Sequence, residues 1–463
     1  MLREKYPLFL YRSSSCRVSR AELELSFDYL VEPDIAFEPK IRFVLPEDLR
    51  LQPSPCFAPF AFYVGSVELF SYWKATCSQN IRFESGFLTP ALRVLLEELM
   101  FRGMGEFFFR NAIDYRGDDF VAFSSSKGAP RHQLSLGDAG SRVVENLLMF
   151  SGGKDSLLSA ILLKDLGIDF HCISLNPSGR TRELLAQLRP EGGVTIERKI
   201  DARLLVLNEL GYLNGHTPFS ALLAAYSTFC AFALGATSVI ASNESTCDRP
   251  NASYLGDEIN HEFSKSSVFE RSYNDFLREE FSSSARYYSL IRPLNELQVV
   301  CLFSGYREYL NSFVSCNRRR GESWCGCCSK CISVFALFYP FVGPQLCSEI
   351  FGGNLFCDEG NWALLSDLLG GAEYRPFECV ATEEELLVAL YLSLRLYEKG
   401  DLSLPSLLKR AKDEYLEAKG LSLCFARELL LSWNETHSVP QEIAAAIRVK
   451  LIEAVDRSFA SWS

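Results

Sequence analysis

Residues Ser151 to Ser156 have the composition of a loop that binds phosphate groups. The segment is Ser-Gly-Gly-Lys-Asp-Ser, between an apolar run at 145–150 and an apolar helical run at 155–167. Two glycines let the backbone approach an anion closely, and a helix N-terminus behind them offers unpaired N–H groups and partial positive charge. Lys154 adds a full positive charge. The Gly-x-x-x-x-Gly-Lys spacing of a Walker loop is absent, which indicates another type of nucleotide loop.

Four cysteines further along the chain have the spacing of a metal site. The pattern is C-x8-C-x2-C-x2-C, formed by Cys316, Cys325, Cys328 and Cys331. Four thiolates suit tetrahedral zinc, and four protein ligands leave no open position, so we expect a structural Zn²⁺ site. Cys327 could replace a neighbouring ligand or stay free. The alternative is a set of buried thiols, which does not account for the close spacing.

The elements around both motifs predict an α/β fold. Apolar strands alternate with helices: strands at 145–150, 170–175, 194–200 and 238–242, and helices at 155–167, 180–189 and 217–235. This alternation predicts a doubly wound parallel sheet with ligands at the carboxyl ends of its strands. We expect an N-terminal α+β domain at 1–140, the α/β domain with both motifs at 141–345, and a C-terminal helical region at 346–463.

The flanking regions have their own patterns. Residues 21–28 and 40–45 alternate as half-exposed strands, and residues 89–100 form a helix with a capping threonine and a proline at its start. A polar linker is expected at 124–132. Four C-terminal helices are expected at 382–399, 403–419, 423–433 and 440–455.

Composition narrows the class of protein. The 463-residue chain has a net charge of -11, which argues against nucleic acid as its main partner. Residues 211–243 contain no Asp, Glu, Lys or Arg, but their Asn, His and Pro favour a buried helix and strand over a membrane span. The chain has 16 cysteines and no evident secretory signal, so we expect a cytoplasmic protein with reduced thiols.

The loop at 151–156 resembles the pyrophosphate loop (PP-loop) of the N-type ATP pyrophosphatases, which have the adenine nucleotide alpha hydrolase-like fold. The resemblance implies that ATP and Mg²⁺ bind here and that ATP is split to AMP and pyrophosphate. It implies that Ser151, Gly152, Gly153 and Ser156 hold the β,γ-phosphates and that Lys154 neutralises them. Asp155 would hold the loop or Mg²⁺; the alternative is an acid that favours the helix dipole.

Further segments resemble the UDP-N-acetylmuramoyl-L-alanyl-L-glutamate epimerase family of peptidoglycan synthesis. They are Tyr-x-Lys within 71–76, Gly-x-Gly-Glu-Phe within 103–111 and Asn-His-x-x-Ser-Lys-Ser within 258–266, together with the loop and the cysteines. The resemblance implies conversion of the terminal L-Glu of UDP-MurNAc-L-Ala-L-Glu to D-Glu through a carboxyl adenylate. Adenylation removes the carboxylate charge, which makes the carbonyl an electron sink and acidifies the α-carbon.

Several residues are candidates for roles on such a substrate. Cys247, His261 and Lys265 are candidates for proton transfer, since a thiol of lowered pKa can exchange a carbon-bound proton. Capping, packing or surface roles are the alternatives. Lys74 and Glu106 are candidates for substrate contact, although a snorkelling lysine packed among aromatic residues explains Lys74 nearly as well. The three arginines at 318–320 could meet the UDP diphosphate or form a solvated turn.

Three other functions remain open from the sequence. A carboxylate-adenylating ligase resembling 7-cyano-7-deazaguanine synthase would share the loop and the cysteines over 141–340, but would leave both ends of the chain unexplained. A tRNA-thiolating PP-loop enzyme is disfavoured by the acidic charge. A non-enzymatic, zinc-containing interaction module is disfavoured because the loop keeps every polar group.

Overall fold

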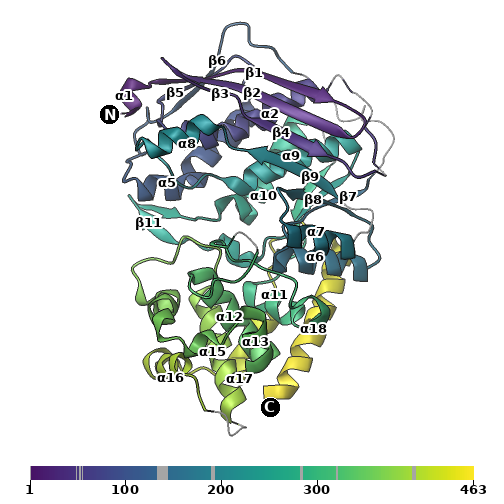
Figure 1. The fold of residues 1–463 in the computed structure, drawn as a ribbon, viewed down its shortest axis with the longest axis vertical. Coiled ribbons are helices and arrows are strands. Elements are labelled where there is room, and N and C mark those ends of the chain that lie inside the picture. Colours follow the sequence, from purple (N-terminus) through teal and green to yellow (C-terminus); the bar gives the residue numbers. More distant parts are fainter. Residues whose placement is uncertain are drawn as a thin grey trace.

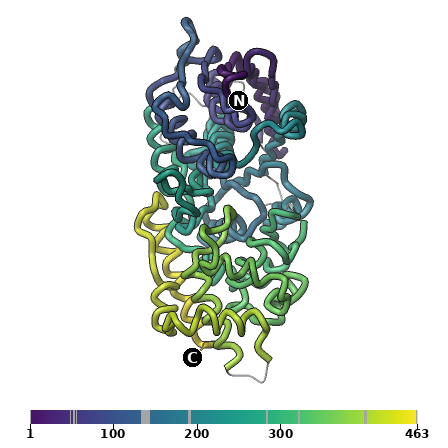
Figure 2. The backbone as a smooth tube through the Cα atoms, turned by 90° about the vertical axis from the view of Figure 1, so that its left-hand side faces the viewer, coloured from purple at the N-terminus to yellow at the C-terminus, as the bar shows by residue number. Residues whose placement is uncertain are grey.

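The computed structural model describes residues 2–47, 49–51, 54, 56–132, 144–188, 193–281, 285–319, 322–398 and 403–462. The boundary expected at residue 140 and Arg320 lie outside these ranges. A sheet with its helices forms one end of the molecule, and helices alone form the other (Figure 1). Figure 2 shows the N-terminus at the sheet end and the C-terminus at the helical end.

Among the described residues, eleven strands form one sheet in the order β13-β10-β7-β8-β9-β4-β2-β1-β5-β6, with β3 paired to β2. The strands are β1 (Leu8–Val18), β2 (Glu22–Val31), β3 (Ile35–Phe37), β4 (Lys40–Val44), β5 (Asn80–Phe83), β6 (Ala122–Ser125), β7 (Asn146–Met149), β8 (His171–Leu175), β9 (Val194–Lys199), β10 (Ser238–Ala241) and β13 (Arg286–Ser289). A separate hairpin consists of β11 (Ala252–Tyr254) and β12 (Asp257–Ile259).

The sheet is mixed and mostly parallel, and the four strands expected to be parallel are so, but the N-terminal strands continue the same sheet. Strands β13, β10, β7, β8 and β9 are mutually parallel, as are β1, β5 and β6. The two groups are joined by antiparallel pairs, above all β4 with β9, where Phe43 lies opposite Ile196. Both side chains are buried, so the alternating N-terminal strands turn their apolar face into the same core as the α/β region.

Helices cover the sheet and form the second half of the molecule (Figure 1). Those of the first part are α1 (Leu2–Lys5), α2 (Phe57–Glu68), α3 (Phe70–Trp73), α4 (Pro90–Glu98), α5 (Gly105–Arg110), α6 (Lys154–Asp165), α7 (Gly179–Leu188), α8 (Ala202–Glu209), α9 (Phe219–Leu234) and α10 (Ser267–Phe281). Those of the second are α11 (Glu296–Phe303), α12 (Ser329–Val342), α13 (Pro344–Phe351), α14 (Trp362–Ser366), α15 (Glu383–Glu398), α16 (Ser406–Ala411), α17 (Leu423–Leu431) and α18 (Gln441–Trp462).

Most of the uncharged stretch at 211–243 lies in the interior of the fold. It contains α9 and β10, and α9 packs against α2 in the core shared with the N-terminal strands. A helix buried on nearly all sides needs no polar face, and Gly235 ends it in the left-handed conformation (φ 71°). Within the described ranges, no helix combines the length and the apolar character that crossing a membrane requires.

The expected strands at 145–150, 170–175, 194–200 and 238–242 are confirmed as β7 to β10, each end within one residue. Two expectations were wrong in detail. The linker expected at 124–132 begins inside β6, which pairs with β5. The last helix continues to Trp462 rather than ending at 455, because the Trp462 side chain is fully buried against the helical core.

Candidate functional site

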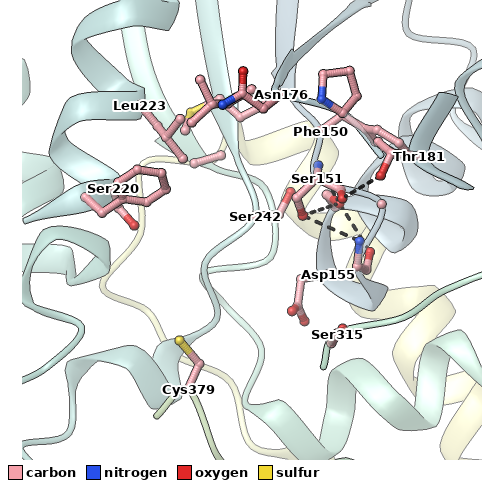
Figure 3. Close-up of a pocket in the computed structure, with 18 of the residues that line it drawn as sticks. Phe150, Ser151, Asp155, Asn176, Thr181, Ser220, Leu223, Ser242, Ser315 and Cys379 are labelled. Atoms are coloured by element: carbon pink, nitrogen blue, oxygen red, sulfur yellow. Dashed lines mark hydrogen bonds between the residues drawn. The ribbon is translucent and has the colours of Figure 1, made fainter. Parts of the chain in front are cut away.

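A cavity of about 570 Å³ lies at the carboxyl ends of β7, β8 and β10. Its walls include Met149, Leu175 and Ala241, the last residues of those strands, and the first turn of α9. Figure 3 shows Ser151, Asp155 and Thr181 on one wall and Ser220 and Leu223 of α9 on another. The cavity therefore lies at the edge of the sheet where the alternation of strands and helices in the sequence predicts a ligand site.

The loop at 151–156 has a defined conformation. Gly152 has φ of +78°, and a Cβ there would lie 2.9 Å from Oγ1 of Thr181, so only glycine fits. The hydroxyl of Thr181 donates to the carbonyl of Ser151 at 3.3 Å. The N–H of Ser151 donates to Oγ of Ser156 at 3.2 Å. The loop is thus held in place by its own hydroxyl groups and by α7.

The side chain of Lys154 does not face the cavity. It is fully buried, with Nζ 2.5 Å from Oδ1 of Asp155 and 3.0 Å from Oε1 of Glu296. Burial alone would lower the pKa of Lys154, but the neighbouring carboxylates outweigh burial and raise it. The loop cation is therefore a buried ammonium beneath the loop, neutralised by carboxylates.

Three carboxylates surround that ammonium, those of Asp155, Glu244 and Glu296, with oxygens within 4.8 Å of one another. Burial and the nearby Glu296 raise the pKa of Glu244 well above its usual value. Burial opposes ionisation of Glu296, but Lys154 and Lys330 outweigh it and lower its pKa. Carboxylate oxygens suit Mg²⁺, and Asp155 is the member of this group that lines the cavity.

The structure brings together the four cysteines expected to bind zinc. The sulfurs of Cys316, Cys325, Cys328 and Cys331 all lie within 4.8 Å of one another, and this set of thiols suits tetrahedral Zn²⁺. Cys327 is exposed, and its sulfur accepts a hydrogen bond from Arg318. The same segment borders the cavity, because Cys316 and Lys330 both line it. A metal here would fix one wall of the cavity.

A second group of polar side chains, which we call the thiol cluster, comprises Cys379, His261, Lys265 and Glu106. Cys379 lines the cavity on its own chain segment, on a wall away from Ser151 and Thr181 (Figure 3). Nζ of Lys265 donates to Sγ of Cys379 at 2.8 Å. Nδ1 of His261 lies 2.5 Å from Oε2 of Glu106. Burial would lower the pKa of His261, but hydrogen bonds with Cys379 and Glu106 outweigh it and raise the pKa to about 9.

The proton-transfer candidates occupy different places. Lys265 lines the cavity, and His261 lies behind Cys379. Cys247 is 1% exposed, and its thiol donates towards Glu244 at 3.3 Å and Glu262 at 3.5 Å. Burial and these two carboxyl groups raise the pKa of Cys247 well above its usual value. Cys247 is therefore a neutral thiol within the wall.

The candidates for substrate contact lie on the N-terminal side. Glu106 is part of the thiol cluster, and its carboxylate also accepts a hydrogen bond from Nε of Arg110 at 2.5 Å. Lys74 donates to the carbonyl of Gly215 at 2.9 Å, and burial together with Arg198 lowers its pKa to about 8. Arg318 and Arg319 are exposed. Sequence reasoning missed Cys379, because nothing in its local pattern marks it; only its partners, far away in the chain, give it a role.

These features define an α/β protein with a glycine loop and a polar, thiol-containing cavity at the ends of its strands. Residues 2–290 match the MurL N-terminal domain, and residues 312–419 match the MurL C-terminal domain. The chain therefore belongs to the MurL family.

Three curated relatives carry the name UDP-N-acetyl-alpha-D-muramoyl-L-alanyl-L-glutamate epimerase. The protein of Xanthomonas oryzae is 29% identical over 386 residues, covering 82% of this chain and 83% of the relative. That of Micromonospora is 32% identical over 332 residues, or 70% and 72% of the two chains. That of Salinispora tropica is 31% identical over 327 residues, or 70% of each. The family predicted from the sequence is confirmed, and these relatives are named as epimerases, which are isomerases.

Proposed function

We propose that this protein is an epimerase of peptidoglycan precursor synthesis, which converts the terminal L-Glu of UDP-MurNAc-L-Ala-L-Glu to D-Glu. The observation that carries the proposal is one cavity with two walls of different chemistry. One wall is the glycine loop, suited to an anion, and the other is the thiol cluster, suited to proton exchange. Membership of the MurL family over both parts of the chain supports the same reaction.

The loop supports ATP as the second substrate. In this proposal Ser151, Gly152, Gly153 and Ser156 bind the β,γ-phosphates in the manner of a PP-loop, at the N-terminus of α6. The run of parallel strands β10-β7-β8-β9 is what a doubly wound ATP pyrophosphatase would require. Asp155 would hold Mg²⁺, which supplies charge neutralisation. Lys154 would act from beneath the loop, since direct contact requires its ammonium to leave Asp155 or Glu296.

The chemistry explains why ATP would be used. A glutamyl α-carboxylate resists loss of the α-proton, because the product carries two adjacent negative charges. Transfer of AMP to that carboxylate releases pyrophosphate and gives a mixed anhydride whose acyl group no longer carries a negative charge. Its carbonyl can therefore accept the electron pair of the broken C–H bond. A proton returned to the opposite face inverts the centre, and water then releases AMP and restores the carboxylate.

The remaining groups have supporting roles in this proposal. The four cysteines would hold a structural Zn²⁺ that fixes the wall bearing Cys316 and Lys330. Lys74 would meet the substrate from the N-terminal side, and Arg318 and Arg319 its diphosphate, while Glu106 would act through His261. A nucleotide-linked substrate and unpaired thiols fit a cytoplasmic enzyme. The domains at 1–140, 141–345 and 346–463 would act as one unit, since β4 and β9 join the first two.

The test is incubation with UDP-MurNAc-L-Ala-L-Glu, ATP and Mg²⁺ in D₂O, following AMP and deuterium at the glutamyl α-carbon. We expect AMP, pyrophosphate, deuterium and D-Glu together, and none of them when ATP is omitted. AMP without deuterium would overturn epimerisation in favour of a ligase resembling 7-cyano-7-deazaguanine synthase. Deuterium without AMP would overturn the role of ATP.

A further inference from the structure

Cys379 is held at the cavity by the chain on both sides of it. The carboxylate of Glu378 accepts the backbone N–H of Lys330 at 3.1 Å, and the carbonyl of Cys379 accepts from Nζ of Lys330. One residue further on, the carbonyl of Val380 accepts from Arg375 at 3.0 Å. The thiol therefore has a defined position, although it comes from the coil before α15 and not from the sheet.

Two cationic groups meet at the sulfur of Cys379. Nζ of Lys265 donates to it at 2.8 Å, the imidazole of His261 lies beside it, and the carboxyl group of Glu262, which also accepts from Lys265, faces it. Burial would lower the pKa of Lys265, but Cys379 and Glu262 outweigh burial and raise it well above its usual value. Lys265 and His261 therefore bring two proton-carrying groups to one sulfur, an arrangement that serves general acid–base catalysis.

Glu106 fixes the orientation of His261. Its Oε2 lies 2.5 Å from Nδ1 of His261, and its side chain is only 7% exposed. Nδ1 of His216 lies 3.5 Å from the same oxygen. Burial and the neighbouring His261 lower the pKa of His216 to about 3, so its imidazole stays neutral. A carboxylate, an imidazole and a thiol are thus arranged in series, as in enzymes that activate a nucleophile or base.

We propose that Cys379 is the catalytic base for one face of the glutamyl α-carbon, with Lys265, His261 and Glu106 as positioning residues. This inference rests on the proposed function. The α C–H bond breaks, the S–H bond forms at Cys379, and the electron pair moves into the adenylated carbonyl. The electron pair then returns to the α-carbon and forms a new C–H bond with a proton from water on the other face, and Cys379 loses its own proton to water. Cys247 is the less favourable candidate for this role, because it is buried and hydrogen-bonded to carboxyl groups.

The test compares Cys379→Ala and Cys379→Ser with Cys424→Ala, a change at an exposed cysteine far along the chain. Two steps are measured on each protein: ATP–pyrophosphate exchange that depends on UDP-MurNAc-L-Ala-L-Glu, and deuterium uptake at the α-carbon. We expect both Cys379 variants to keep the exchange reaction and to lose deuterium uptake by at least about 100-fold, the usual contribution of a general base. Cys424→Ala should keep both.

Deuterium uptake by either Cys379 variant at the wild-type rate would overturn the proposal. Loss of exchange in the wild-type protein would instead overturn the proposed adenylation. Alkylation by iodoacetamide, followed by peptide mapping, gives a second measurement on the native protein. Cys379 should react at least about tenfold faster than Cys424, and Glu106→Gln should remove that difference, because a neutral amide no longer favours the imidazolium. Equal rates for Cys379 and Cys424 in the wild-type protein would also overturn the proposal.

Discussion

Nζ of Lys154 lies 3.0 Å from Oε1 of Glu296, with both side chains buried. Glu296 is the first residue of α11, so this ion pair connects the glycine loop to the helical half of the molecule. A buried charge that loses its partner is costly, because water cannot replace that partner. The geometry of the loop therefore depends on a residue outside the loop.

We expect Glu296→Gln to destabilise the protein by about 3 kcal/mol, the usual loss when one partner of a buried pair is removed. Glu383→Gln is the matched control, because Glu383 pairs with Lys419 on the surface, and exposed pairs contribute less than about 1 kcal/mol. Urea unfolding of both variants measures the difference. Equal urea midpoints for wild type and Glu296→Gln would show that Asp155 alone is enough to neutralise the charge of Lys154.

Gly152→Ala should abolish most ATP turnover without unfolding the protein. A Cβ at φ of +78° costs about 1–2 kcal/mol and would lie 2.9 Å from Thr181, so the loop must change shape. We expect AMP formation to fall at least about tenfold. The control is Gly179→Ala at the start of α7, where a Cβ meets no atom within 4 Å. Normal AMP formation by Gly152→Ala would exclude the loop as the phosphate site.

The stability contribution of His261 should depend on pH. Its pKa is raised from 6.5 to about 9 in the folded protein, so its contribution is complete below pH 6.5 and disappears as pH rises through 9. The groups around it are Glu106, Cys379, His216 and Phe377. We expect the stability difference between wild type and His261→Gln to shrink from pH 6 to pH 9.5 in urea unfolding. A constant difference would contradict the raised pKa.

The four clustered cysteines should bind one zinc ion per chain. Cys328→Ser should lose the metal and lower the melting temperature, because a thiolate ligand is replaced by a hydroxyl. Cys327→Ser should keep the metal, since Cys327 is exposed and lies outside the cluster of four sulfurs. Metal analysis by mass spectrometry after gel filtration checks both variants. Zinc retained by Cys328→Ser would rule out the four-cysteine site.

The local sequence pattern was sufficient to predict the features that depend on residues close together in the chain. The strands β7, β8 and β10 are short, largely apolar runs, β9 begins with alternating apolar residues, and Cys325, Cys328 and Cys331 are close in sequence, so these features could be expected. The burial of Lys154 and the partners of Cys379 could not be predicted from the sequence, because each depends on a side chain from a distant segment. The pairing of β4 with β9 was missed for the same reason: periodicity shows which face of a strand is apolar, not which strand it meets.

The junction of β4 with β9 also has a consequence for biosynthesis. Arg42 and Glu197, which pair across it, are 155 residues apart in the chain. While a ribosome makes the segment between them, β4 has no partner on one side and presents unpaired backbone groups that favour aggregation. Contacts so distant in sequence also slow folding. We therefore expect recombinant yield to depend on chaperone capacity and growth temperature, and fragments ending between β4 and β9 to accumulate in inclusion bodies.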